Sequence, residues 1–83
     1  MPDQQENHQK ILAELLRERR VKAGVKQSEL AEKLGKPQSW VSRHERGDLR
    51  LDFLELRAYL QLLGVSMPAF VAAFEKRAEQ RSN

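Results

Sequence analysis

The stretch GVKQSELAEKLGKPQSWVSRHERG, residues 24–47, decides the fold. It contains two short segments with apolar residues at helical spacing, at 27–34 and from 37 or 38 to 46, separated by Gly35. Glycine commonly follows the last turn of a helix, and Pro37 suits the first turn of the next because its missing N–H costs nothing there. The pattern therefore predicts a helix-turn-helix over about residues 27–46.

The flanking sequence predicts three more helices and no strand, because no stretch combines β-branched residues with an alternation of apolar and polar residues over four or more positions. Asp52 and Glu55 have the spacing of a capping box, and Ser66 can cap the last helix. The expected ranges of these helices are about 8–23, 52–63 and 67–80. We therefore expect an all-α, compact five-helix domain.

The chain of 83 residues is long enough for one small domain. We expect a flexible segment over 1–8, the helix-turn-helix domain over 9–78 and a frayed tail over 79–83. With no cysteine and only two histidines, the sequence predicts no disulfide and no metal site. Its apolar runs are too short for a signal peptide or a membrane span. These features are typical of a cytoplasmic protein without a cofactor.

Positive charge is concentrated in the middle of the chain. Residues 17–50 hold ten Lys or Arg against five acids, a local net charge of +5 in a chain whose total is +3. A basic centre in an otherwise slightly acidic frame is typical of a surface that binds a polyanion. A solvated charged surface is the alternative.

The helix expected from residue 37 or 38 to 46 has two different sides on a helical wheel. Its polar side carries Gln38, Ser39, Ser42 and Arg43. Its other side carries Trp40, Val41 and His44. The pattern favours one face that reads a partner and one that packs on the domain.

Three motifs, GVKQSELAEKLG, KPQSWVSRHERG and LQLLGVS, resemble the Cro and phage-repressor type of helix-turn-helix transcriptional regulators, the XRE family. The resemblance covers about residues 9–66. It implies a bacterial or phage-encoded regulator with a repressor-type five-helix fold that binds a double-stranded DNA operator, usually as a dimer. It also implies that the second motif helix lies in the major groove.

The resemblance implies roles for two sets of residues. The expected base-reading residues are Gln38, Ser39, Ser42 and Arg43. The expected phosphate-binding residues are Gln27, Lys36, Arg46 and Arg50. The amide of Gln38 matches adenine and the guanidinium of Arg43 matches guanine. Ser39 and Ser42 could contact bases or phosphates, and an ordinary solvated surface is the alternative for both sets.

The resemblance further implies that Arg20 and Glu45 form a structural ion pair inside the domain, with a solvated surface pair as the alternative. Lys26 departs from the family pattern because the helix that follows it lacks the usual side-chain cap. His44 stands where most members have a core residue. We expect it to be a half-buried, packed imidazole rather than a pH switch, and we expect Trp40 to pack rather than to stack on bases.

Phe70, Val71 and Phe74 form an apolar strip on the last expected helix. Because one short reading helix covers few base pairs, we expect a homodimer on a two-fold symmetric operator and assign this strip to its interface. Alternatively, the strip only completes the core of the monomer.

An enzyme is not expected. Ser42 and His44 are the nearest pair resembling a nucleophile and a base, but they point to different sides of their helix. Two further binding functions stay open. One is an antitoxin or restriction-modification controller with the same DNA-binding domain and a possible protein partner. The other is a helical adaptor that binds a protein through the exposed face of its last helix.

Overall fold

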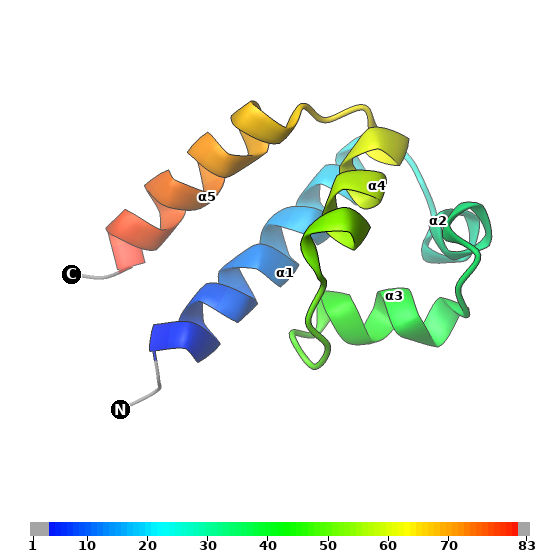
Figure 1. Ribbon diagram of the computed structural model, residues 1–83, viewed down its shortest axis with the longest axis horizontal. Helices are drawn as coiled ribbons and strands as arrows, with labels where there is room; N and C mark the ends of the chain where they lie inside the picture. Colours follow the sequence, from blue (N-terminus) through cyan, green and yellow to red (C-terminus); the bar gives the residue numbers. More distant parts are fainter. Residues whose placement is uncertain (1–3, 82–83) are drawn as a thin grey trace.

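The computed structural model describes residues 4–81, and these residues form five helices and no strand (Figure 1). The helices are α1 (Gln4–Lys22), α2 (Gln27–Leu34), α3 (Gln38–Glu45), α4 (Phe53–Leu63) and α5 (Met67–Arg81). The expected all-α, five-helix architecture is confirmed. In Figure 1, α5 runs beside α1, α4 lies in front of α1, and the α2–α3 pair forms the opposite end of the molecule.

The helix ends follow the local chemistry of the sequence. Asp52 and Glu55 form the expected capping box, in which Glu55 N donates to Asp52 Oδ1 (2.7 Å) and Asp52 N donates to Glu55 Oε1 (3.0 Å). Ala69 N donates to Ser66 Oγ (3.3 Å) at the start of α5. Gly35 ends α2 with φ +69°, a left-handed conformation that glycine adopts at little cost. The turn between α2 and α3 thus forms where the sequence predicts it.

The observed helices are longer at the chain ends than expected. Helix α1 begins at Gln4 rather than near residue 8, and α5 continues to Arg81. Residues 4–8, expected to be flexible, therefore lie in α1, and residues 79–81 lie in α5. Residues 1–3 and 82–83, also expected to be mobile, lie outside the described residues.

Long-range contacts join the two terminal helices. Arg77 of α5 donates to both carboxylate oxygens of Glu18 (2.7 and 2.9 Å), and Arg81 lies 2.8 Å from Glu14. The ring of His8 meets the ring of Phe74 edge-on at 5.9 Å. Each of these contacts joins residues that are far apart in sequence, so hydrophobic periodicity alone did not predict them.

The core lies between α1 and the other four helices. Its largest fully buried side chains are Tyr59, Phe70, Ile11, Leu15, Leu16, Leu30, Leu60 and Val41. Phe70 is only 2% exposed, so it completes the core of the monomer and is not available for the dimer interface to which we assigned it. Val71 stays exposed and Phe74 is half-buried.

Among the described residues, no single helix is long and apolar enough to cross a membrane. Only α4 and α5 taken together, with a bend of 107° between them, have the length and composition to do so.

Candidate nucleic-acid interface

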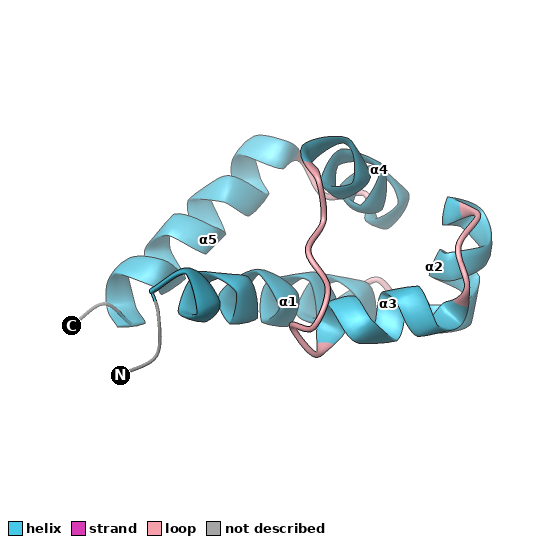
Figure 2. Ribbon diagram, turned by 60° about the horizontal axis from the view of Figure 1, so that its bottom comes forward, coloured by secondary structure: helices cyan, strands magenta, loops and turns pink. Residues whose placement is uncertain are grey.

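Helix α3 has one side packed on the domain and one side free. Val41 and His44 are 0% and 3% exposed, and Trp40 is half-buried against the core. The four expected base-reading residues lie on the other side. Gln38, Ser39 and Arg43 are exposed and Ser42 is half-buried. In Figure 2, α3 lies along the lower edge of the molecule and no helix covers it from below.

Glu45, the last residue of α3, is held by Arg20 of α1. Arg20 Nε and Nη2 donate to the two oxygens of Glu45 at 2.6 and 2.9 Å, and Arg20 Nη1 donates to the carbonyl of Val25 at 2.8 Å. The Glu45 side chain is only 4% exposed. The structure therefore brings Arg20 and Glu45 together as a buried, bidentate pair that ties α3 to α1.

The ionised forms of this pair are favoured. Burial by itself would raise the pKa of Glu45, but hydrogen bonds from Arg20 and Gln27 outweigh it and the pKa is lowered. The hydrogen bond to Glu45 raises the pKa of Arg20. Burial, followed by the charge of Glu45, raises the pKa of Tyr59, whose hydroxyl donates to Glu45 Oε2 at 3.5 Å. Glu45 therefore carries its charge inside the domain and does not present it to a partner of α3.

Two glutamine amides connect this buried charge to the exposed face. Gln27 Nε2 donates to Glu45 Oε1 at 3.0 Å, and Gln38 Nε2 donates to Gln27 Oε1 at 3.5 Å. An amide nitrogen has two N–H groups and an amide oxygen two lone pairs. Gln38 therefore keeps one N–H and its carbonyl for a bidentate contact, and Gln27 keeps one N–H for a phosphate.

Lys36 precedes α3 and has partners within the domain. Its Nζ lies 3.9 Å from Glu55 Oε2 and 5.3 Å from the centre of the Trp40 ring. A cation over an indole face is attracted by the electrons of the ring. Lys36 would have to give up part of these contacts to bind a phosphate, so its net contribution should be smaller than that of a free lysine.

Arg46 and Arg50 follow α3 on the loop that leads to α4. Both are exposed, and Arg46 Nε lies 3.5 Å from Asp48 Oδ2. This surface pair is worth little in water. Both guanidinium groups can therefore turn toward an anion that approaches the outer side of α3.

His44 is more deeply buried than expected. Its ring lies 4.5 Å from the Trp40 ring in an edge-on arrangement, and Nε2 is buried without a hydrogen-bond partner among the described residues. Burial lowers the pKa of His44, although the nearby Glu55 and Glu45 favour the charged form. A position near the C-terminal end of a helix favours the imidazolium, but desolvation is the larger effect.

The buried neutral His44 should make stability fall in acid. The unfolded chain binds a proton near the ordinary histidine pKa of about 6.5, whereas the folded protein binds it only at lower pH. The free energy of unfolding should therefore be constant above this value and decrease as the pH falls below it. Urea unfolding between about pH 5 and 7.5 measures this slope, and His44→Leu should remove it. An unchanged slope in His44→Leu would contradict the assignment.

Several of these contacts were not predicted from the sequence. The Gln27–Glu45 and Tyr59–Glu45 hydrogen bonds join residues on different helices, and the Lys36–Glu55 contact joins the turn before α3 to α4. Hydrophobic periodicity does not report contacts of this kind. Trp40 and His44 were placed on one side of α3 by their i, i+4 spacing, and they do pack together. No group of three potential metal ligands occurs in the described part of the chain.

Comparison with known proteins gives the following matches. The clp gene regulator ClgR from Corynebacterium glutamicum is similar in structure, with a TM-score of 0.82 and 24% identity over 90% of this chain and 80% of that chain. A second ClgR structure has a TM-score of 0.76 and 26% identity, covering 83% of this chain and 88% of that one. The restriction-modification controller protein C.Esp1396I, solved as a tetramer with its natural 35 base-pair operator, has a TM-score of 0.77 and 22% identity, covering 86% and 93%.

No curated protein sequence matches the chain. The sequence model of a family described as "Helix-turn-helix domain" matches residues 11–74, which reach from the first turns of α1 into α5. Because this match covers most of the 83 residues, the chain belongs to the helix-turn-helix domain family.

Proposed function

We propose that the chain is a transcriptional regulator, a repressor, that binds double-stranded DNA through α3 as a homodimer on a two-fold symmetric operator. The observation that supports this most strongly is the polar, exposed outer face of α3. The opposite, buried side of α3 and the buried Arg20–Glu45 pair hold the helix on the domain. A helix that is packed on one side and polar on the other can present hydrogen-bonding side chains to base edges while its orientation stays fixed. The chain would act in the cytoplasm and would have no catalytic role.

The roles of individual residues follow from their position. Gln38 and Arg43 would read base edges, with Ser39 and Ser42 contacting bases or phosphates beside them. Gln27, Lys36, Arg46 and Arg50 flank α3 and would contact phosphates, which sets affinity and register but not sequence. The similar fold of C.Esp1396I, solved on its own operator, supports this general mode of binding.

Selection from a random duplex library tests the proposal directly. We expect the bound sequences to converge on two inverted half-sites whose centres lie about 10 to 10.5 base pairs apart. The affinity for the selected operator should fall steeply as salt is added, because each phosphate contact releases counterions. No DNA affinity at low salt would contradict the proposal and would favour an adaptor that binds another protein.

A further inference from the structure

The start of α4 exposes two neighbouring large apolar side chains. Phe53 and Leu54 are 66% and 72% exposed, more than any other large hydrophobic residue that the structure describes. Neither is needed to begin the helix, since Asp52 supplies the cap. A single exposed leucine is ordinary, but an adjacent pair on a small domain points to a covering partner. We call Phe53 and Leu54 the α4 patch.

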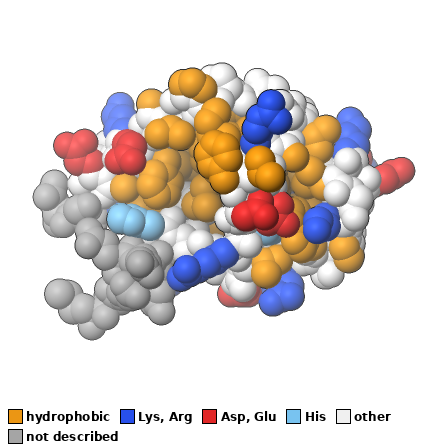
Figure 3. Space-filling model, viewed as in Figure 1, with side chains coloured by type: hydrophobic (Ala, Val, Ile, Leu, Met, Phe, Trp, Pro, Cys, Tyr) orange, Lys and Arg blue, Asp and Glu red, His pale blue; other side chains and the backbone are white. Residues whose placement is uncertain are grey.

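The α4 patch borders the flank of α3. Leu54 lines a cleft of about 230 Å³ together with Trp40 of α3 and Lys36, which lies just before α3. Figure 3 shows hydrophobic side chains gathered on this face, with acidic and basic side chains beside them. The patch is therefore continuous with the element that we assign to the major groove.

A second copy docked on the α4 patch would lie where a two-fold symmetric operator requires it. A helix in the major groove lies across the duplex, and the second half-site is about one helical turn away along the DNA axis. The second copy must then dock beside α3. Helix α5, with the exposed Val71, packs on α1 at the side of the molecule away from α3 (Figure 1). A dimer formed through Val71 would hold the two reading helices far apart.

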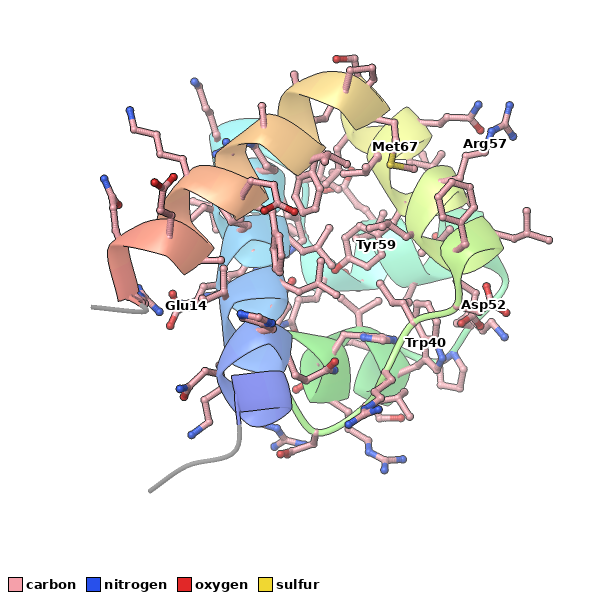
Figure 4. The ribbon with its side chains drawn as sticks, turned by 60° about the vertical axis from the view of Figure 1, so that its left-hand side comes forward. Glu14, Trp40, Asp52, Arg57, Tyr59 and Met67 are labelled. Atoms are coloured by element: carbon pink, nitrogen blue, oxygen red, sulfur yellow. The ribbon has the colours of Figure 1, made fainter. Side chains whose placement is uncertain are left out.

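The charged residues beside the α4 patch can pair with the same residues of a second copy. Asp52 and Arg57 are both exposed, on either side of the patch in the sequence. Figure 4 shows the two side chains along the outer edge of α4, with Trp40 below them. In a two-fold arrangement with antiparallel α4 helices, Arg57 of one copy faces Asp52 of the other. Such mutual pairing is the mark of an isologous interface.

We propose that the α4 patch is the docking surface for a second copy of this chain, related by a two-fold axis that passes near Leu54. The proposal rests on the proposed function for its geometry and replaces the apolar strip of α5 as the dimer interface. The α4 patches of the two copies cover each other, and two Asp52–Arg57 ion pairs between the copies flank them. One copy binds one half-site, and the tighter binding to both half-sites of the operator requires the dimer.

Cysteine cross-linking tests the position of the axis, because the chain has no cysteine of its own. Residues next to a two-fold axis meet their own copies, and a disulfide forms only when the Cα atoms lie within about 7 Å. Leu54→Cys should therefore form a covalent dimer under mild oxidation that still binds the selected operator. Val71→Cys, at an exposed apolar position of α5, should stay monomeric. The reverse pattern would overturn the proposal.

Sedimentation of charged variants gives an independent result without DNA. Leu54→Asp should raise the dimer dissociation constant by about 30-fold or more, as expected for a central interface residue. Val71→Asp is the matched control and should sediment as the wild type does. A dimeric Leu54→Asp, or a wild type that is monomeric both free and on DNA, would overturn the proposal.

DNA binding separates this proposal from the proposed function. Leu54→Asp should bind a duplex with one half-site as the wild type does and lose only the tighter binding to two half-sites. If the wild type is a dimer through the α4 patch but binds no DNA, the proposed function is wrong and the docking surface stands.

Discussion

Glu45→Ala is expected to lower the free energy of unfolding by about 3–5 kcal/mol, because it leaves the Arg20 guanidinium buried without its counter-charge. Glu45 receives hydrogen bonds from Arg20, Gln27 and Tyr59, so the substitution also removes the acceptor of two further donors. A domain of this size has a total stability of about 4–12 kcal/mol. Urea unfolding followed by circular dichroism measures the loss.

A surface pair of similar geometry is the control. Arg77 and Glu18 are also bidentate, but the Glu18 side chain is 49% exposed. Glu18→Ala should therefore cost at most about 1 kcal/mol. Equal losses for Glu18→Ala and Glu45→Ala would mean that burial of the Arg20–Glu45 pair does not matter.

A double substitution distinguishes the cost of leaving Arg20 buried without a counter-charge from the loss of the Arg20–Glu45 attraction itself. Replacement of a buried pair by apolar residues of similar volume is often close to neutral. Arg20→Met combined with Glu45→Met should therefore regain most of the stability lost in Glu45→Ala. Since Glu45 also orients Gln27, the double variant should still bind DNA less tightly than the wild type at a temperature where both are folded.

The elements of the fold could be predicted because their signals are local. Gly35, Pro37 and the Asp52–Glu55 box mark helix ends within a few residues of where the structure has them. The sequence predicts that α2 lacks a side-chain cap at Lys26, and the structure has none. The backbone N–H of Lys26 nevertheless donates to Glu29 Oε1 at 3.2 Å. Signals of this kind depend on the backbone conformation of one turn and need no knowledge of the rest of the chain.

The packing of α5 could not be predicted in the same way. The apolar strip at Phe70, Val71 and Phe74 has the same periodicity whether it covers a core or a second copy. Its function is decided by the angle between α5 and α1, which the Arg77–Glu18 contact across 59 positions helps to fix. That angle buries Phe70 and leaves Val71 outside.

The candidate site shows the same division. The outward position of Gln38 and Arg43 follows from the helical period, and the Arg20–Glu45 contact followed from the resemblance to a known family. The burial of His44 and the Gln27–Gln38 hydrogen bond depend on how α2, α3 and α4 meet. Sequence reasoning located the exposed face of α3 and its ion pair with α1, but not the hydrogen bonds that link Gln38 through Gln27 to Glu45.

Alanine substitution should separate the residues that read bases from those that grip the backbone. Gln38→Ala and Arg43→Ala each remove a bidentate contact to one base, so each should weaken binding to the selected operator by about 1–3 kcal/mol and relax the preference at one position. Both side chains are exposed in the free protein, so folding should not be affected. Binding to a scrambled duplex should change much less.

Lys36→Ala, Arg46→Ala and Arg50→Ala should instead weaken the operator and the scrambled duplex alike. Each should also flatten the slope of log affinity against log salt by up to about one unit, because one phosphate contact is lost. The effect of Lys36→Ala should be the smallest, since Lys36 already contacts Glu55 and the Trp40 ring. The measurement is the affinity of every variant for both duplexes at several salt concentrations. If Gln38→Ala and Arg43→Ala weaken both duplexes equally, α3 does not read the sequence, and the preference of the wild type must come from the shape of the DNA or from another part of the chain.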